Sequence, residues 1–544
     1  SAPFSSGINN TALGYQALKG FTTGYNNVAI GSQAAYRLTT GAYNIAIGDN
    51  TLNASGVSGG HNIIMGYSAG TSITSGEYNI AIGRESLIHT STADHNLAIG
   101  YKALQYTGQK ISTTTDTIGI GREAGQYSAA AYNIWMGSFA GKGSSANAHS
   151  PGTSNIGIGY QSSVSFISGS YNVAVGGNTL YNNQHGEYNV AIGLGAGDHA
   201  TGSNNTFVGS NAGKGGTTSA PFSSGGSNTA LGYQALYSFT TGYLNTAMGY
   251  KALYAATTGY ENVAIGSNAM RYLTTGVWNV SIGINSGPNA MGSRVVAIGE
   301  LAGRMNKGLG NVHIGYRAGF YVSGSYNTTI GYQAGYGGTS SAPYSTGTYN
   351  VALGYNALSS FTTGYNNVAV GGGAGDSINT GYNNTIMGSS AGTNLTTGFN
   401  NVIIGRVAAY ASTDVDKAVI IGEQAAYTGN MTSAADGTIS IGNNAGKNVT
   451  SAEASTFVGS GAGANVTTGD HNTAFGKSAG SQITTGGETV TVGYLAGQYA
   501  TGSYNTFLGS EAGKGGTTSA PYSSGENNTA LGYQALTAFT TGGS

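Results

Sequence analysis

One six-residue pattern returns along the entire chain and limits the fold more than any other feature. At Asn26–Gly31 it has the sequence NNVAIG, and its last residue, named here the anchor glycine, occurs thirty times from Gly14 to Gly532. Neighbouring anchor glycines are mostly sixteen to eighteen residues apart. Repeats of this kind indicate a solenoid, because a short unit buries its apolar face only against the next unit. We therefore predict that residues 1–544 form one continuous all-β array, a parallel β-solenoid of about thirty coils of roughly seventeen residues.

Each anchor glycine follows three residues with the alternation of a short strand. The residue before the glycine is aliphatic in every coil except at Phe475, and the residue two places earlier is β-branched except at Leu97. Such alternation predicts a strand whose two flanking positions share one face. We expect these positions to face the core and the middle residue, usually Ala, to face the opposite side. The predicted core residues include Val28, Ile30, Ile45, Ile47, Ile80 and Ile82.

Two further columns of the repeat are nearly uniform. The third residue after the anchor glycine is Ala in twenty-five coils and Ser or Thr in the other five, which predicts a second short strand or a bend with room for a methyl-sized group. The fourth residue before the glycine is Asn in twenty-four of the thirty coils. Stacked coils would place these amides in a row, where each one donates to the next. We predict this structural ladder for Asn27, Asn44, Asn62, Asn79, Asn96, Asn172 and Asn189.

A ring residue often precedes that Asn and predicts an aromatic stripe along one edge of the solenoid. The stripe includes Tyr43, Tyr78, Tyr171, Tyr188 and Trp278, with His61, His95 and His471 in the same position. Two interpretations stay open: the rings stack on one another between coils, or they are exposed and contact a cell-surface glycan. The Thr-Thr-Gly turns also raise ice binding, but flexible glycines and interrupting tyrosines argue against the flat Thr array that it needs.

The composition disfavours several classes of partner. Only 7% of the residues are charged and the formal net charge is −1, so the chain has no long-range field for nucleic acid or acidic membranes. The chain has no Cys, which removes disulfides and thiolate metal sites together. Because no apolar run reaches about eighteen residues, we expect no membrane insertion in this segment.

No motif for catalysis or cofactor binding stands out. The string AGKGG at Ala212–Gly216 lacks the Ser or Thr that follows Lys in a phosphate-binding loop. Asp and Glu are scattered without the recurring pair that a glycosidase needs, and the turns carry Thr and Asn where a calcium-binding repeat carries Asp. We therefore predict no catalytic residue, no metal site and no cofactor, and we expect that the chain is not an enzyme.

Several insertions interrupt the regular spacing and predict surface loops, where variable function usually lies. The cassette AGKGGTTSAPFSSG at Ala212–Gly225 recurs in similar form at Ala334–Gly347 and Ala512–Gly525. In all, we predict loops near residues 105–117, 141–155, 213–227, 335–349, 427–437 and 513–527. Because the chain begins and ends inside repeats, we expect it to be a fragment of a longer fibre.

The repeat resembles two known families across nearly the whole chain. The N-x-A-I-G coil is similar to the head β-roll repeats of trimeric autotransporter adhesins. The segments NTALGYQAL (Asn10–Leu18) and TTGYNNVAIG (Thr22–Gly31) look even more like shaft repeats of phage and bacterial tail fibres. Both families are homotrimeric, so the resemblance implies three solenoids around one axis. The coil is longer than that of the adhesins, and their stalk and anchor are missing here, as is the chaperone domain of many tail fibres.

These features lead to one functional hypothesis and two alternatives. The first is a structural protein that forms the stiff shaft of an extracellular or virion-surface fibre, such as a phage tail fibre, and presents a binding tip. The alternative is a bacterial surface adhesin whose rod binds glycan or host matrix directly. A polysaccharide-cleaving tailspike would need a carboxylate cluster on adjacent coils, and the sequence contains none.

Overall fold

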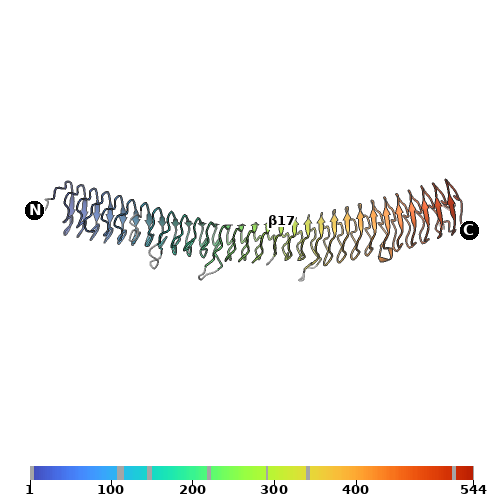
Figure 1. The fold of residues 1–544 in the computed structure, drawn as a ribbon, viewed down its shortest axis with the longest axis horizontal. Helices are drawn as coiled ribbons and strands as arrows, with labels where there is room; N and C mark the ends of the chain where they lie inside the picture. The colour runs from blue at the N-terminus through green and yellow to red at the C-terminus, as the bar shows by residue number, and fades with distance from the viewer. Residues whose placement is uncertain are drawn as a thin grey trace. The chain divides into compact units, whose positions relative to one another are not determined.

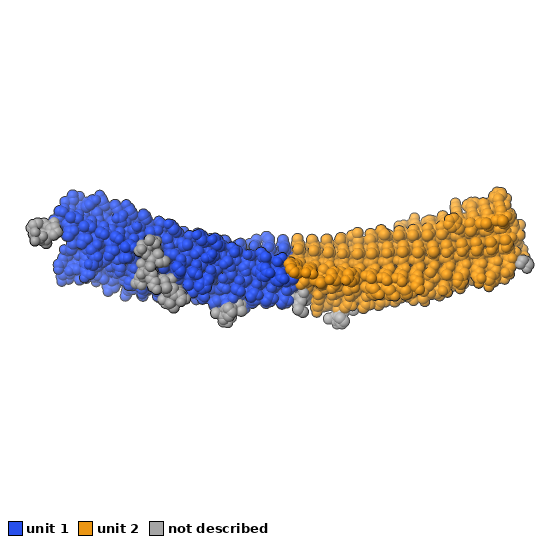
Figure 2. All heavy atoms as spheres, in the orientation of Figure 1, with its two compact units in different colours: residues 1–277 blue, residues 278–544 orange. Residues whose placement is uncertain are grey.

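The computed structural model describes residues 5–106, 115–143, 150–216, 222–288, 292–338, 344–516 and 522–542. Its regular elements are three-residue β-strands and one single-turn 3-10 helix, η1 (Ser433–Ala435). The chain divides into two compact units, Ser1–Val277 and Trp278–Ser544, which Figure 2 distinguishes by colour. Each unit is described by itself.

The first unit contains fifteen described strands, one for each coil. They are β1 (Thr11–Leu13), β2 (Val28–Ile30), β3 (Ile45–Ile47), β4 (Ile63–Met65), β5 (Ile80–Ile82), β6 (Leu97–Ile99), β7 (Ile118–Ile120), β8 (Ile134–Met136), β9 (Ile156–Ile158), β10 (Val173–Val175), β11 (Val190–Ile192), β12 (Thr206–Val208), β13 (Thr229–Leu231), β14 (Thr246–Met248) and β15 (Val263–Ile265).

The second unit contains fifteen described strands of the same length. They are β16 (Val280–Ile282), β17 (Val296–Ile298), β18 (Val312–Ile314), β19 (Thr328–Ile330), β20 (Val351–Leu353), β21 (Val368–Val370), β22 (Thr385–Met387), β23 (Val402–Ile404), β24 (Val419–Ile421), β25 (Ile439–Ile441), β26 (Thr456–Val458), β27 (Thr473–Phe475), β28 (Val490–Val492), β29 (Thr506–Leu508) and β30 (Thr529–Leu531).

Within each unit, successive strands pair in parallel at the register of the sequence repeat. In the first pair, Ala12 lies opposite Ala29 and Leu13 lies opposite Ile30. The strands of each unit therefore form one row of parallel arrows, with the turns of the coils completing the stack (Figure 1). The predicted fold class is confirmed: the chain is an all-β parallel solenoid of about thirty coils of roughly seventeen residues.

The prediction of which strand residues face the core was wrong. The middle residue is buried in every strand from β2 to β30, and Ala29, Ala46 and Ala81 are fully inaccessible. The flanking residues point outward: Val28, Ile30, Ile45, Ile47 and Ile80 are only half-buried, and Ile82 is 37% exposed. Alternation fixes two opposite faces but does not say which one is inside. A coil of this length encloses a narrow interior, and the small middle residue is the one that fits there.

The segment after the anchor glycine, predicted as a second strand or a bend, is a turn in the described coils. Its residues alternate between ordinary and left-handed backbone conformation, with positive φ at Gln33 (55°) and Ala35 (48°). The turn still bonds to both neighbouring coils: the Gln33 N–H donates to Tyr15 O at 2.7 Å and the Ala35 N–H donates to Thr51 O at 2.8 Å. Ala34 between them is fully buried, so the uniform small column lines the interior of the coil.

The anchor glycine is required by the close approach of successive coils. Gly371 has a φ of +133°, where only glycine avoids strain. A Cβ atom added there would lie 2.6 Å from the carbonyl oxygen of Gly388 in the next coil. The same close contact recurs at the anchor positions along the chain, which explains why the sequence shows no substitution in this column.

Large interior side chains are matched by glycines in the adjoining coils. Trp135 occupies the middle of β8 and is fully buried. A Cβ on Gly125 would lie 2.5 Å from Trp135 Cδ1, and one on Gly157 would lie 2.6 Å from Trp135 Cε3. Gly141 would likewise meet the indole ring. The interior thus stays closely packed, because a large side chain in one coil lies against glycines that leave room for it.

The described parts of the insertions leave the stack and return to it at fixed positions. In the insertion near 427–437, Thr432 caps η1 by accepting a hydrogen bond from the Ala434 N–H at 3.4 Å. Near the end of each of the three cassettes, a single parallel bridge joins the chain to the preceding coil: Ala200 with Ser223, Val322 with Ser345, and Ala500 with Ser523. The remaining predicted loops include residues 107–114, 144–149, 217–221, 339–343 and 517–521, which lie outside the described residues.

Candidate functional site

The predicted Asn ladder is present and is buried inside the coils. Asn44 donates to Asn27 Oδ1 through its backbone N–H at 2.9 Å and its side-chain Nδ2 at 3.2 Å. Its Nδ2 also reaches Gly59 O in the following coil at 3.0 Å. The same side-chain bond joins further successive members: Asn62 to Asn44, Asn79 to Asn62, Asn96 to Asn79, and Asn189 to Asn172. Because each oxygen and each amide finds partners in adjacent coils, the ladder holds the coils in register.

The ladder continues where the sequence lacks Asn, because the backbone N–H at that position still donates to the Asn of the preceding coil. The N–H of Val295 donates to Asn279 Oδ1 at 2.9 Å, and the N–H of Ala418 donates to Asn401 Oδ1 at 2.9 Å. A residue without a side-chain amide therefore still provides a donor for the Asn Oδ1 of the preceding coil. The residue before the ladder Asn has positive φ, as at Tyr43 (58°).

The aromatic stripe is exposed and stacked at the same time. The rings of Tyr43, His61, Tyr78 and His95 follow one another with centroid separations of 4.8–5.1 Å and nearly parallel planes. Tyr171 and Tyr188 stack in the same way at 5.0 Å. In the second unit, the Arg294 guanidinium lies 4.7 Å from the Trp278 ring. The stacked rings cover each other's faces and present hydroxyl groups and edges to solvent, so no sugar ring fits between them.

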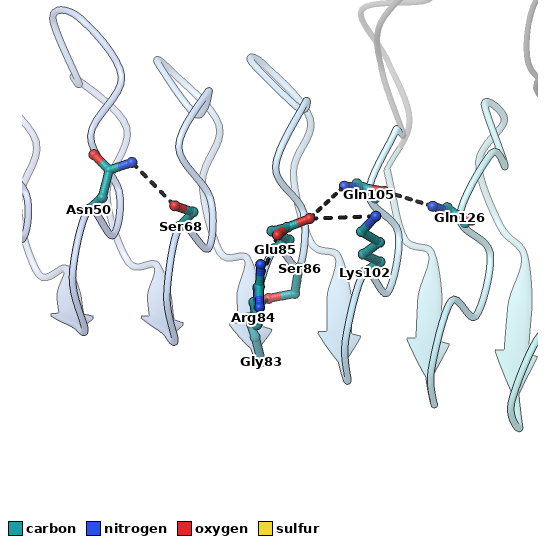
Figure 3. Close-up of polar contacts among 9 residues, drawn as sticks. All are labelled: Asn50, Ser68, Gly83, Arg84, Glu85, Ser86, Lys102, Gln105 and Gln126. Carbon is teal, nitrogen blue, oxygen red and sulfur yellow. Dashed lines mark hydrogen bonds and ion pairs between the residues drawn. The ribbon is translucent and has the colours of Figure 1, made fainter.

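A second row of side chains follows the turns of the first unit and is polar (Figure 3). Glu85 lies 3.0 Å from Arg84 Nε and 3.7 Å from Lys102 Nζ, and it accepts a hydrogen bond from Gln105 at 3.3 Å. Gln126 in turn donates to Gln105 at 2.7 Å. Apart from the pair of Arg84 with Glu85, which lies within one turn, these contacts join successive coils. Ion pairs this exposed contribute little to stability individually.

One histidine that sequence analysis did not single out is buried in the second unit. His313 occupies the middle of β18, and burial lowers the pKa of its imidazole to about 3. Its Nε2 lies 2.8 Å from Asn306 Nδ2 and its Nδ1 lies 2.8 Å from Thr329 Oγ1. The amide nitrogen of Asn306 only donates, so Nε2 accepts and Nδ1 carries the proton. The sequence could have pointed to His313, because it occupies the middle strand position, where most coils have Ala.

The outward faces of the strands form an apolar surface on each unit. The last residue of each strand is often about two-fifths exposed, as for Ile192 at 42% and Leu353 at 43%. The first strand residue lies on the same outward face, since side chains alternate along a strand. The sequence placed these residues in the core, so this surface was missed.

The described residues hold no group of three or more His, Asp or Glu side chains arranged to bind a metal ion. They also contain no helix with the length and hydropathy needed to cross a membrane. Comparison of the sequence with protein-family models and with curated proteins gives no match.

Proposed function

We propose that this chain is a structural protein, the shaft of a stiff extracellular or virion-surface fibre such as a phage tail fibre. In this proposal, copies of the chain assemble as a homotrimer and hold a binding tip away from the base of the fibre. The work of the shaft is mechanical and needs no catalytic residue, cofactor or metal.

The observation that carries the proposal is the apolar outward face of the strands. Fifteen described strands per unit, each exposing part of a large aliphatic side chain, make a stripe on the order of 1,000 Å², beyond the few hundred Å² that a monomer usually exposes. That area is sufficient for a specific interface between protein chains. The stripe repeats at every coil, so its natural complement is the same stripe on another copy. The resemblance to trimeric fibres favours three copies.

Stiffness follows from the bonds that every coil makes. Each described coil is joined to the next through its strand, its turn and the Asn ladder, as in the coil of Ile45–Ile47. Bending the stack would lengthen the bonds on its convex side and compress those on its concave side. A shaft of this kind needs few charges, because its cohesion is distributed over the repeat.

A bacterial adhesin that binds glycan along its rod is the second candidate. The exposed edges of Tyr171 and Tyr188 favour it. The faces of these rings already stack on each other, which removes the surface that sugars prefer, so the fibre proposal has more support.

The proposal is tested by the mass of the assembled chain in solution. Light scattering should give about three times the chain mass of 54.5 kDa. Ile192→Lys and Leu353→Lys place a charge on the outward stripe of each unit, and together they should yield the monomer mass with an unchanged β-sheet circular dichroism spectrum. Thr380→Lys, at an exposed turn, is the matched control and should remain a trimer. A monomer mass for the unmodified chain would overturn the assembly.

A further inference from the structure

A hollow of about 280 Å³ opens on the turns of the first unit. It is lined by Gln161, Asn178, Tyr181, Asn182, Asp198 and His199. These residues come from the turns after β9, β10 and β11, so the hollow spans three successive coils. With coils spaced about 4.8 Å apart, its length is roughly 10 Å. It lies on the turns and not on the outward face of the strands.

The carboxylate of Asp198 is the unusual group in this hollow. Its side chain is 18% exposed, and within the described residues none of its oxygens accepts a hydrogen bond. Its nearest polar contact, His199 Nε2, lies 3.7 Å from Oδ2, and the other ring nitrogen of His199 lies 2.8 Å from Asn182 Nδ2. Burial raises the pKa of the Asp198 carboxyl, against the lowering effect of His199 and Lys214. A largely buried acceptor with no described donor within hydrogen-bond distance carries a free-energy cost that a bound donor would relieve.

The same corner elsewhere in the chain lacks this arrangement. Asp376 occupies the equivalent turn position in the second unit, but its carboxylate accepts a hydrogen bond from the Ser359 hydroxyl in the preceding coil. The three coils before the last cassette have other residues at the positions that line the hollow. They carry Gly461, Ser478, Ser481, Gln482, Gln498 and Tyr499 at the six lining positions. The fold therefore accommodates the corner with or without the carboxylate and the tyrosine.

We propose that this hollow binds a neutral saccharide unit through Asp198, the side-chain amides of Gln161, Asn178 and Asn182, and Tyr181. Sugar hydroxyls donate to a carboxylate and exchange hydrogen bonds with amides, which both donate and accept. The tyrosine supplies an aromatic surface for the apolar face of the ring. The Asp198 carboxylate repels an anionic sugar, and the positive charge of Lys214, which lowers the pKa of that carboxyl, opposes the ammonium of an amino sugar.

Saturation-transfer difference NMR on the full chain tests the site. The probes are methyl glycosides of glucose, galactose, mannose and N-acetylglucosamine, with glucuronic acid and glucosamine as charged counterparts. At least one neutral glycoside should bind, and Asp198→Gln and Tyr181→Ser should each weaken its Kd about tenfold or more. Both variants install the residue that the chain itself carries at Gln498 or Ser481, so they preserve the fold. Gln498→Ala, at the equivalent corner, should leave the Kd unchanged.

Three outcomes would overturn the assignment. They are the absence of binding by every neutral glycoside, preferential binding of glucuronic acid or glucosamine, and an unchanged Kd in both variants of the hollow. Light scattering on the same samples separates a loss of binding from a loss of assembly.

Discussion

The size matching inside the coils predicts a strong energetic coupling between Trp135 and Gly157. A methyl group at residue 157 would lie 2.6 Å from Trp135 Cε3, inside van der Waals contact. Overpacking of this kind costs about 1–3 kcal/mol, and the backbone of Gly157 adds no strain because it is not left-handed. Trp135→Ala alone should cost about 3–5 kcal/mol, because the indole fills the interior of its coil.

The double variant should behave differently from the sum of the two changes. With Ala at both positions, the coils regain the Ala-on-Ala packing of Ala29 and Ala46. Gly157→Ala should then be neutral or stabilising by up to about 1 kcal/mol, through the reduced entropy of the unfolded chain. The expected coupling energy is therefore about 1–4 kcal/mol.

Hydrogen exchange followed by mass spectrometry measures this coupling locally, which suits a solenoid whose coils open separately. Opening free energies would be compared at the amides of β8 and β9 in the four members of the cycle. Phe207→Ala is the matched control, because β12 does not adjoin β9 and its effect should add to that of Gly157→Ala. A cost for Gly157→Ala that is equal with and without Trp135 would refute the size-matching argument.

Three further predictions follow from single columns of the repeat. His313 binds a proton at about pH 3 when folded and near 6.5 when unfolded, so its contribution to stability is complete above 6.5 and is lost as the pH falls towards 3. Local opening at β18 should be easier by about 2 kcal/mol at pH 5 than at pH 7.5, and His313→Thr should abolish this dependence in hydrogen exchange. Asn384→Ala removes bonds to Asn367 Oδ1 and Gly398 O and leaves Asn401 Nδ2 without that acceptor. Hydrogen exchange near β22 should therefore reveal a loss of about 2–4 kcal/mol. Asn383→Ala in the exposed row should cost only about 1 kcal/mol, because Ala tolerates the positive φ of that residue less well than Asn does. In Gly371→Ala the new methyl group meets Gly388 O, which should cost about 2–4 kcal/mol. Gly372→Ala should be tolerated, because the nearest atom to its methyl group would be Tyr355 O at 4.0 Å. Equal thermal stability of the two variants would contradict the role of the anchor glycine.

The sequence by itself determined the period of the coil, the position of each strand and the columns that stack. These features repeat thirty times, so each column is sampled often enough to show what it tolerates. The Asn column shows this well: an amide that bonds to its copies in the next coils leaves a clear compositional record, and Asn27, Asn44 and the other predicted members are all in the ladder. The small column is equally clear, because Ala34 is fully buried in the narrow interior of its coil.

Only the tertiary structure decided which face of the strand is inside. Alternation is unchanged when the two faces are exchanged, and the larger side chains of Val28 and Ile30 suggested the wrong choice. The closure of a short coil around a narrow interior places Ala29 inside and leaves the aliphatic rows outside, where they become the proposed interface. The pairing of Trp135 with its glycines and the hollow around Asp198 also depend on neighbouring coils, since each joins residues about one or two repeats apart that no local pattern connects.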